Sequence, residues 1–226
     1  MDWVVEQIEK PQTLAEAVIT VLRKALHSGT LKPGDPINEA ELARQLGISR
    51  APVREATRIL EQQGLLEIVP RKGVCVTDLS AEDLKEVFTL RAVLEGLAVR
   101  LAVENGAYDD AAIAELQDLT DQIRTGTDFL KSLDADERFH ELLCGKSNHK
   151  LLLGVLSNLR LKIRQAHIST RLVEENYRQL ADRHQAVVDT IIRGDPEAAE
   201  QTIKEHVTQA AELRLQSLDP DGSSTP

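Results

Sequence analysis

Residues 31–76 read LKPGDPINEAELARQLGISRAPVREATRILEQQGLLEIVPRKGVCV, and this stretch decides the fold of the first part of the chain. Apolar residues at helical spacing predict a short helix over 39–46 and a second helix over 50–63. Only three residues, Gly47-Ile48-Ser49, separate the two helices. Two short helices joined by a tight turn that contains glycine are typical of a helix-turn-helix.

Residues at the ends of these helices support the assignment. Asn38 is a good N-cap for the first helix, and Glu41 at the third helical position completes the pattern of a capping box. Ser49 is an N-cap for the second helix, and Gly64 stands just past its end. We therefore expect capping hydrogen bonds from both Asn38 and Ser49.

The second helix has one apolar and one cationic face. Val53, Ala56 and Leu60 recur at helical spacing, which leaves the arginines on another face. Such a stripe alone is commonly just a solvated surface, but the N-terminal end of a recognition helix is also where bases are read. The expected base-reading residues are Ser49, Arg50 and Arg54, and the expected phosphate-binding residues are Arg44, Arg58, Arg71 and Lys72.

Two short β-prone runs follow, at 65–69 and 73–76. The intervening residues from Pro70 to Gly73 favour a turn, so the pair predicts a β-hairpin with a basic tip. A hairpin in this position is the wing of a winged helix-turn-helix.

A further helix is expected before residue 31. Thr13 and Glu16 form a capping box, and Gly29 ends the run. Its expected apolar stripe consists of Leu14, Val18, Val21, Leu22 and Leu26.

Composition limits the function classes. The 226 residues carry a formal net charge of -10, which argues against a protein that coats nucleic acid indiscriminately. Residues 42–73, in contrast, hold six basic and three acidic side chains, a net charge of +3. The chain has neither an apolar run long enough for a membrane span nor a secretory signal, so we expect a cytoplasmic protein. Cys75 and Cys144 fall in different predicted domains and are expected to be reduced thiols.

The remainder of the chain is expected to be helical, which makes the fold mainly α. We predict a winged helix-turn-helix domain over 1–78, an all-helical bundle of six or seven helices over 79–218, and a disordered tail over 219–226. Ser80 is the expected N-cap of the bundle's first helix. The expected helices span about 81–105, 109–125, 127–146, 149–170, 174–193 and 196–217.

Four residues of the bundle have a spacing that suits a metal ion. Asp136 and His140 lie one helical turn apart. His184 lies ten residues before Gly194 and His206 lies twelve after it, so an antiparallel helix pair would bring the two imidazoles to nearly the same height. The alternative is that each is a polar residue on a helix surface, and spacing alone leaves that alternative open.

The helix-turn-helix segment resembles the DNA-binding domain of GntR-type regulators, above all in the core SR-x-PVREA-x-x-L-x-x-x-GL. The resemblance implies DNA reading through Ser49, Arg50 and Arg54. It places Arg44 and the wing tip Lys72-Gly73 near the DNA backbone or the minor groove.

The second half resembles the FCD effector domain of FadR-type GntR regulators. The resemblance is carried by D-x-x-x-H at 136–140, by Asn148, by His184 and by GDPEAAEQTIKEH ending at His206, and RAVLE at 91–95 fits it. It implies one divalent ion per chain, with zinc expected and nickel, manganese or iron as alternatives. The implied ligands are Asp136, His140, His184 and His206, and Arg91 and Arg164 are candidates for binding an effector carboxylate.

We therefore expect a non-enzymatic transcription regulator, a repressor, that binds a pseudo-palindromic double-stranded operator as a homodimer. A small organic acid at the metal site would control the affinity for DNA. Two alternatives remain: a regulator that responds to the metal itself, and a metal-dependent hydrolase, for which no separate general base is evident.

Overall fold

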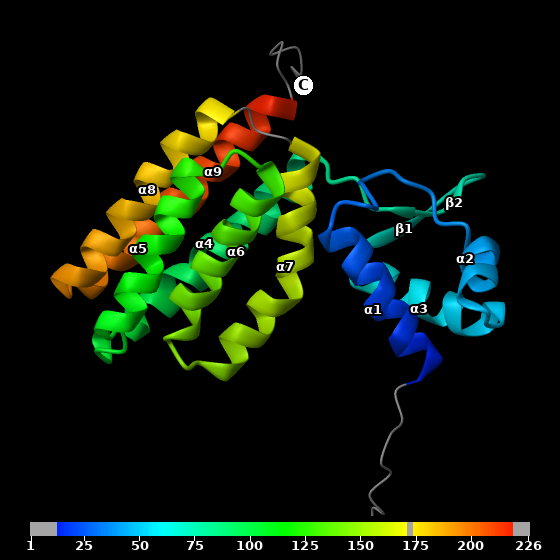
Figure 1. Cartoon of the computed structure of the whole chain (residues 1–226), viewed down its shortest axis with the longest axis horizontal. Coiled ribbons are helices and arrows are strands. Elements are labelled where there is room, and N and C mark those ends of the chain that lie inside the picture. Colours follow the sequence, from blue (N-terminus) through cyan, green and yellow to red (C-terminus); the bar gives the residue numbers. More distant parts are fainter. Residues whose placement is uncertain (1–12, 171–173, 219–226) are drawn as a thin grey trace, which may run out of the picture. The chain divides into compact units, whose positions relative to one another are not determined.

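The computed structural model describes residues 13–170 and 174–218, and the chain divides into two compact units, Met1–Thr77 and Asp78–Pro226 (Figure 1). Each unit is treated by itself. The tail over 219–226, for which we predict disorder, lies outside the described residues.

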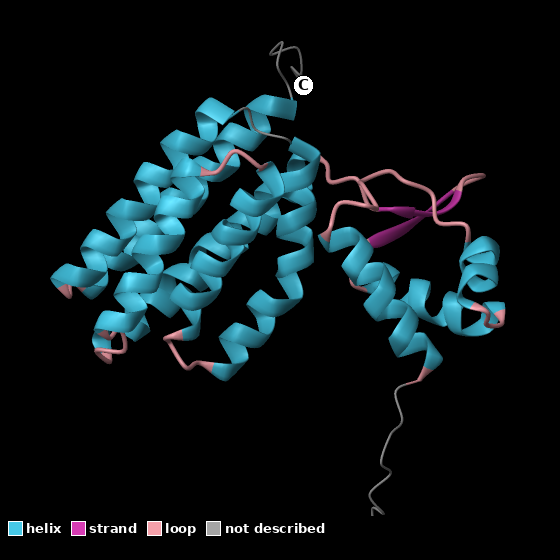
Figure 2. Ribbon diagram, in the orientation of Figure 1, coloured by secondary structure: helices cyan, strands magenta, loops and turns pink. Residues whose placement is uncertain are grey.

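The N-terminal unit contains three helices and a two-stranded antiparallel sheet (Figure 2). Helix α3 packs against α1, α2 and β1, so it is held on several sides. This is the predicted winged helix-turn-helix. Its elements are α1 (Leu14–His27), α2 (Glu39–Leu46), α3 (Arg50–Gln62), β1 (Leu66–Val69) and β2 (Gly73–Val76).

The turn between α2 and α3 depends on Gly47, whose φ of 66° lies in the left-handed region that glycine tolerates best. Asn38 caps α2 as predicted, with its side-chain oxygen accepting from the backbone N–H groups of Ala40 and Glu41. The capping box is wrong, because the Glu41 carboxylate instead accepts from Arg44 and Gln45.

Ser49 occupies the N-cap position of α3, but its side chain makes no capping hydrogen bond. The predicted stripe on α1 also needs correction. Leu14 and Val21 are 57% and 41% exposed, and Ala15 is buried beside Val18 instead. Helical spacing alone predicts a wider apolar face on α1 than the part of that helix that α3 covers.

The wing forms as predicted, with Val69 opposite Gly73 across a three-residue loop. A feature absent from the prediction is a third paired segment. Residues 34–37 lie against β2, where the Ile37 N–H donates to the Val74 carbonyl at 2.7 Å and the Val76 N–H donates to the Asp35 carbonyl at 2.9 Å. The turn-rich stretch before α2 thus anchors the wing.

Six described helices form the C-terminal unit. Helix α4 packs along α9 and also contacts α6 and α7, while α5 packs between α6 and α8 (Figure 1). The core contains Phe88, Phe139 and Leu116. None of the described helices combines the length and apolar character of a membrane span. The helices are α4 (Ala81–Glu104), α5 (Asp110–Thr125), α6 (Phe129–Gly145), α7 (Lys150–Thr170), α8 (Glu174–Arg193) and α9 (Pro196–Leu218).

Candidate metal centre and nucleic-acid surface

The four predicted ligands come together inside the C-terminal unit. Asp136 and His140 lie on α6, His184 on α8 and His206 on α9. One nitrogen or oxygen from each residue lies within 4.8 Å of the corresponding atoms of the other three. The three histidines are buried and the aspartate is half-buried. Three helices therefore contribute to one cluster of potential ligands.

Local geometry explains why the cluster forms. Asp136 and His140 share a helix face because they are one turn apart. Gly194, with φ of 69°, ends α8 and allows α9 to return along it. The imidazole centroids of His184 and His206 consequently lie 4.2 Å apart. Phe139 is fully buried with its ring edge-to-face against His184, which limits the positions this ligand can adopt.

Three buried histidine nitrogens of the cluster have no hydrogen-bond partner among the described residues, and one of them is Nδ1 of His140. Nε2 of His184 and Oδ1 of Asp136 share a hydrogen bond of 3.0 Å. Nε2 of His140 lies 3.9 Å from the same oxygen, too far for a hydrogen bond. This nitrogen and Nδ1 of His206 are buried and have no hydrogen-bond partner among the described residues. Buried orphan nitrogens are costly, and a divalent ion would satisfy both.

The protonation states also suit ligation. Burial opposes ionisation of Asp136, but the hydrogen bond with His184 and the charge fields of His140 and His184 outweigh it and hold its pKa well below the usual range. Burial, together with the charge of Arg91, lowers the pKa of His140. Burial and the two neighbouring imidazoles hold the pKa of His206 well below its usual value. A carboxylate and neutral imidazoles are the forms that bind metals. The cluster can therefore hold a metal ion.

A layer behind the ligands is supplied by α4. Oε2 of Glu95 lies 2.8 Å from Nδ1 of His140, and Nε of Arg91 donates to Oε1 of Glu95 at 2.7 Å. Burial raises the pKa of Glu95, but Arg91 and His140 more than reverse this effect and bring it to about 2. The signal for Glu95 in the sequence was only its place in RAVLE. The contact with His140 was not predicted.

A cavity of about 190 Å³ opens beside the cluster, between α4, α6 and α7. Asp136 and His140 form part of its wall, so a ligand in the cavity can reach the cluster. Arg91 also lines it. The rest of the wall consists of Glu95, Glu137, Glu141, Cys144, Gly145, Leu153, Leu156, Arg160 and Ile163.

Three other residues singled out in the sequence lie elsewhere. Arg164 is buried but does not line this cavity, and its Nη1 lies 2.9 Å from carboxylate oxygens of both Asp134 and Glu137. His149 accepts from the backbone N–H of Leu152 at the start of α7. His167 is buried, and Nη2 of Arg214 lies 2.6 Å from its Nδ1. His149 and His167 are outside the ligand cluster, as predicted.

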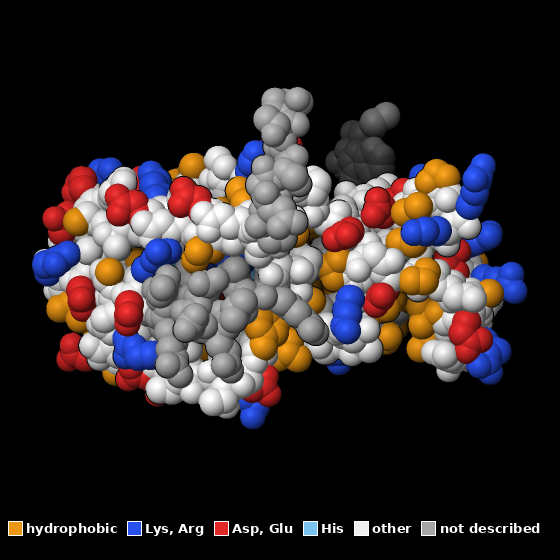
Figure 3. Space-filling model, turned by 90° about the horizontal axis from the view of Figure 1, so that it is seen from above, with side chains coloured by type: hydrophobic (Ala, Val, Ile, Leu, Met, Phe, Trp, Pro, Cys, Tyr) orange, Lys and Arg blue, Asp and Glu red, His pale blue; other side chains and the backbone are white. Residues whose placement is uncertain are grey.

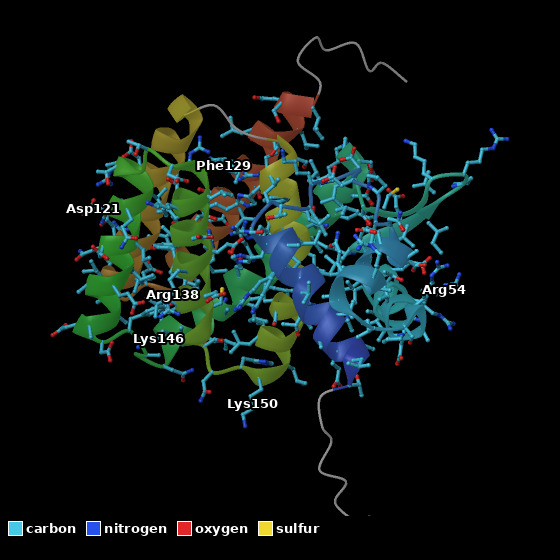
Figure 4. All side chains as sticks on the ribbon, turned by 45° about the vertical axis from the view of Figure 1, so that its right-hand side comes forward. Arg54, Asp121, Phe129, Arg138, Lys146 and Lys150 are labelled. Atoms are coloured by element: carbon cyan, nitrogen blue, oxygen red, sulfur yellow. The ribbon has the colours of Figure 1, made fainter. Side chains whose placement is uncertain are left out.

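The candidate DNA-binding residues are all exposed on the N-terminal unit. Lys and Arg side chains gather at one end of this unit (Figure 3), and Arg54 projects from α3 (Figure 4). Arg44 is engaged by Glu41 at 2.6 Å, and Nε of Arg54 lies 3.6 Å from Glu39. The exposed set is Arg44, Ser49, Arg50, Arg54, Arg58, Arg71, Lys72 and Gly73.

A hollow of about 800 Å³ lies between α3 and the wing. Its wall includes Arg50, Arg54 and Arg58 from α3 and Lys72 and Gly73 from the wing. Arginine and lysine on both sides give this hollow a positive lining, although Glu39 and Glu61 also contribute to it. Such a surface suits a phosphate backbone.

Comparison with known proteins agrees with this architecture. Residues 14–76 match the model of the bacterial regulatory proteins of the gntR family, and residues 86–209 match that of the FCD domain. The chain is 31% identical over 208 residues to the HTH-type transcriptional regulator YdhC of Bacillus subtilis, covering 91% of this chain and 93% of YdhC. It is 23% identical to the HTH-type transcriptional repressor RspR of Escherichia coli, over 91% of each chain.

Among solved structures, McbR/YncC of E. coli superimposes with a TM-score of 0.75 at 25% identity, covering 91% of this chain and 99% of that one. Both halves are thus matched by domain and by whole-chain similarity. The chain belongs to the GntR family of bacterial transcriptional regulators and is a DNA-binding regulator, not an enzyme, with an N-terminal GntR helix-turn-helix domain and a C-terminal FCD domain of the FadR-like subfamily.

Proposed function

We propose that this regulator is a repressor whose operator affinity is controlled by a small carboxylate bound at a metal site in the C-terminal unit. One observation carries the proposal: a buried cluster of three histidines and an aspartate opens on a cavity that Arg91 also lines. The name of the relative RspR supports repression as the sign of regulation.

The ligand set favours a borderline divalent ion, with zinc expected and nickel, manganese or iron as alternatives. An ion that prefers six ligands would keep open positions beside these four protein ligands. As a Lewis acid, it would bind a carboxylate there. His140, His184 and His206 would hold the ion through neutral nitrogens and Asp136 through its carboxylate.

Arg91 is suited to receive the same carboxylate. Its Nε donates a hydrogen bond to Glu95, and no other hydrogen bond of the Arg91 side chain is found among the described residues. A guanidinium can donate two parallel hydrogen bonds to a carboxylate, which fixes the orientation of the ligand. Arg164 is a weaker candidate, because its ion pairs with Asp134 and Glu137 compete for it.

Helix α4 offers a physical route from effector to DNA-binding unit. It carries Arg91 and Glu95, and its first residue, Ala81, follows the last residue of the wing strand, Val76, after only four linking residues. A ligand that binds Arg91 therefore contacts the helix that is directly connected to the wing. Effector and operator must affect each other's affinity reciprocally, typically by about 1–3 kcal/mol.

An apolar surface supports the homodimer. Leu90, Val93 and Leu97 of α4 are exposed at helical spacing, and Leu151 and Val155 are exposed on α7. These two helices pack against each other through the cluster that contains Leu94, Leu152 and Leu156. We call these five exposed residues the α4–α7 apolar surface. Exposed apolar residues grouped in this way mark association surfaces.

A dimer in turn explains how the operator would be recognised. One recognition helix contacts too few base pairs to be specific in a genome, so two copies would read a pseudo-palindromic site. Ser49, Arg50 and Arg54 at the start of α3 are the proposed base readers. Arg44, Arg58, Arg71, Lys72 and Gly73 are the proposed backbone or minor-groove contacts.

The decisive experiment is elemental analysis of the purified, untagged protein together with His140→Ala and His184→Ala. We expect close to one divalent ion per chain in the wild type and loss of the ion in both variants. The variants should retain operator binding but lose the response to carboxylates. A protein that takes up no metal even after reloading contradicts the proposal, and a change of DNA affinity caused by metal alone would favour a metal-responsive regulator.

A further inference from the structure

The cavity beside the metal cluster has two chemically different ends. Helix α6 runs from Phe129 at one end of the unit toward Lys146, and Lys150 begins α7 beside it (Figure 4). Because α6 and α7 form a hairpin, the residues just before the turn lie near the first turns of α7. The polar end of the cavity holds Asp136 and His140, and the turn end holds Cys144, Gly145 and Leu153.

Two acidic groups of the wall are paired with arginines, one of which, Arg164, does not line the cavity. Nη1 of Arg160 lies 2.6 Å from Glu141, and Nη1 of Arg164 lies 2.9 Å from Glu137. A hydroxyl group in the middle of the cavity would therefore have to compete with an ion pair for a partner. Leu153, Leu156 and Ile163 provide the facing apolar wall on α7. Burying a hydroxyl against such a wall without a partner is unfavourable.

The dimensions of the cavity suit a short ligand. Its volume of about 190 Å³ corresponds to about six water molecules at roughly 30 Å³ each. His140 and Cys144 are one helical turn apart, about 6 Å along α6. This length accommodates a short chain that extends from the metal cluster toward the turn.

We propose that the effector is a short monocarboxylic acid with an aliphatic tail of two to four carbons, rather than a sugar acid or a polycarboxylate. The carboxylate lies at the end formed by Asp136, His140 and Arg91. The tail packs on Leu153 and Leu156 toward the α6–α7 turn. This inference rests on the proposed function, since it specifies the ligand class of the same site.

A matched pair of probes tests the polarity of the tail end. 2-Hydroxybutyrate and glycerate have the same number of non-hydrogen atoms and differ by one methyl group in place of a hydroxyl. Calorimetric titration of the full-length, metal-containing protein should give at least tenfold tighter binding of 2-hydroxybutyrate. Gluconate, which is larger and hydroxylated along its whole length, should bind more weakly than both.

Variants of α7 test whether its apolar wall causes the preference for 2-hydroxybutyrate over glycerate. Leu153→Asn should reduce the ratio between the two probes to less than about threefold. Leu161→Asn is the matched control, because Leu161 is equally half-buried on the same helix but does not line the cavity. Leu153→Phe, which fills the turn end, should weaken 2-hydroxybutyrate more than the shorter glycolate. This second variant keeps the test valid if the asparagine variant does not fold.

The outcomes separate this inference from the proposed function. Equal binding of the two probes, tighter binding of glycerate, or gluconate binding as tight as that of 2-hydroxybutyrate overturns the proposed ligand class and leaves a carboxylate-responsive regulator in place. A ratio that Leu153→Asn leaves unchanged overturns the role of the α7 wall. Failure of every carboxylate to bind the metal-containing protein contradicts the proposed function itself.

Discussion

Oε2 of Glu95 lies 2.8 Å from Nδ1 of His140, across the buried contact between α4 and α6. We expect the imidazole proton of His140 on Nδ1, facing this carboxylate, which leaves Nε2 as the candidate metal-binding atom. Carboxylates in this position orient metal-binding histidines and raise their basicity. Nε of Arg91 donates to the other oxygen of Glu95 at 2.7 Å. A single carboxylate therefore links the candidate effector-binding arginine to the candidate metal ligand His140.

We predict that Glu95→Gln weakens metal binding about 10–100-fold. The neutral amide no longer stabilises a proton on Nδ1 of His140, so the imidazole loses its fixed tautomer. Competition with a chromophoric chelator measures the affinity. Glu141→Gln is the matched control, because Glu141 also lines the cavity but pairs with Arg160 instead of a ligand. Equal metal affinity in the wild type and Glu95→Gln would show that Glu95 does not position His140.

Acid should destabilise the metal-free protein before its carboxylates titrate. Burial and the neighbouring Arg214 hold the pKa of His167 well below its usual value. In the unfolded chain this pKa returns to about 6.5, so below that pH the unfolded state binds more protons and stability falls. Thermal unfolding in the presence of a chelator should show Tm decreasing from pH 7.5 to pH 5.5.

Replacement of His167 tests the source of that slope. His167→Gln keeps an oxygen that can accept from Arg214 but removes the titration, so its Tm should depend less on pH than that of the wild type. His149→Gln is the control, since His149 is exposed at the start of α7. An identical pH dependence in His167→Gln and the wild type rules out His167 as a source of the acid sensitivity.

The two classes of DNA contact should differ in their salt dependence. Lys72→Ala should weaken binding to operator and to unrelated DNA alike and reduce the salt slope by about 1. Arg54→Ala should cost about 1–3 kcal/mol on an operator fragment selected in vitro and much less on unrelated DNA. Arg138→Ala, which removes an exposed arginine of α6, serves as the control. If Arg54→Ala weakened both DNAs equally, Arg54 would be a phosphate contact.

Local patterns were enough to predict much of this molecule. Turn residues, caps and helical spacing gave the helix-turn-helix, the wing and the helices of the C-terminal unit. The cluster of candidate metal ligands could also be predicted, because Asp136 and His140 share one helix and His184 and His206 are placed nearly symmetrically about Gly194. Both relationships depend on helix geometry and one reversal of the chain.

Features that depend on contacts between distant segments were missed. Glu95 reaches His140 only because α4 packs on α6, and nothing in the spacing of the two residues indicates this. The pairing of residues 34–37 with β2 is hidden by the prolines and glycine of that stretch. The Arg214–His167 pair likewise joins α9 to α7. Competing hydrogen bonds are missed as well, because the Glu41 carboxylate accepts from Arg44 and Gln45 instead of completing the capping box.

The α4–α7 apolar surface is the proposed interface of the homodimer. Val93 is 54% exposed between Leu90 and Leu97, so Val93→Glu places a charge in the middle of the surface. Burying that unpaired charge in an interface is costly, and we expect the variant to be a monomer by light scattering at concentrations where the wild type is a dimer.

Ile192→Glu is the matched control for this variant. Ile192 is 52% exposed, but it lies on α8, outside the α4–α7 apolar surface, so the same change of charge should leave the dimer intact. Because one recognition helix is too short for specific binding, monomeric Val93→Glu should bind an intact pseudo-palindromic operator and a single half-site with similar, weak affinity. A Val93→Glu protein that remains dimeric would exclude this surface as the interface and leave the DNA-binding residues as proposed.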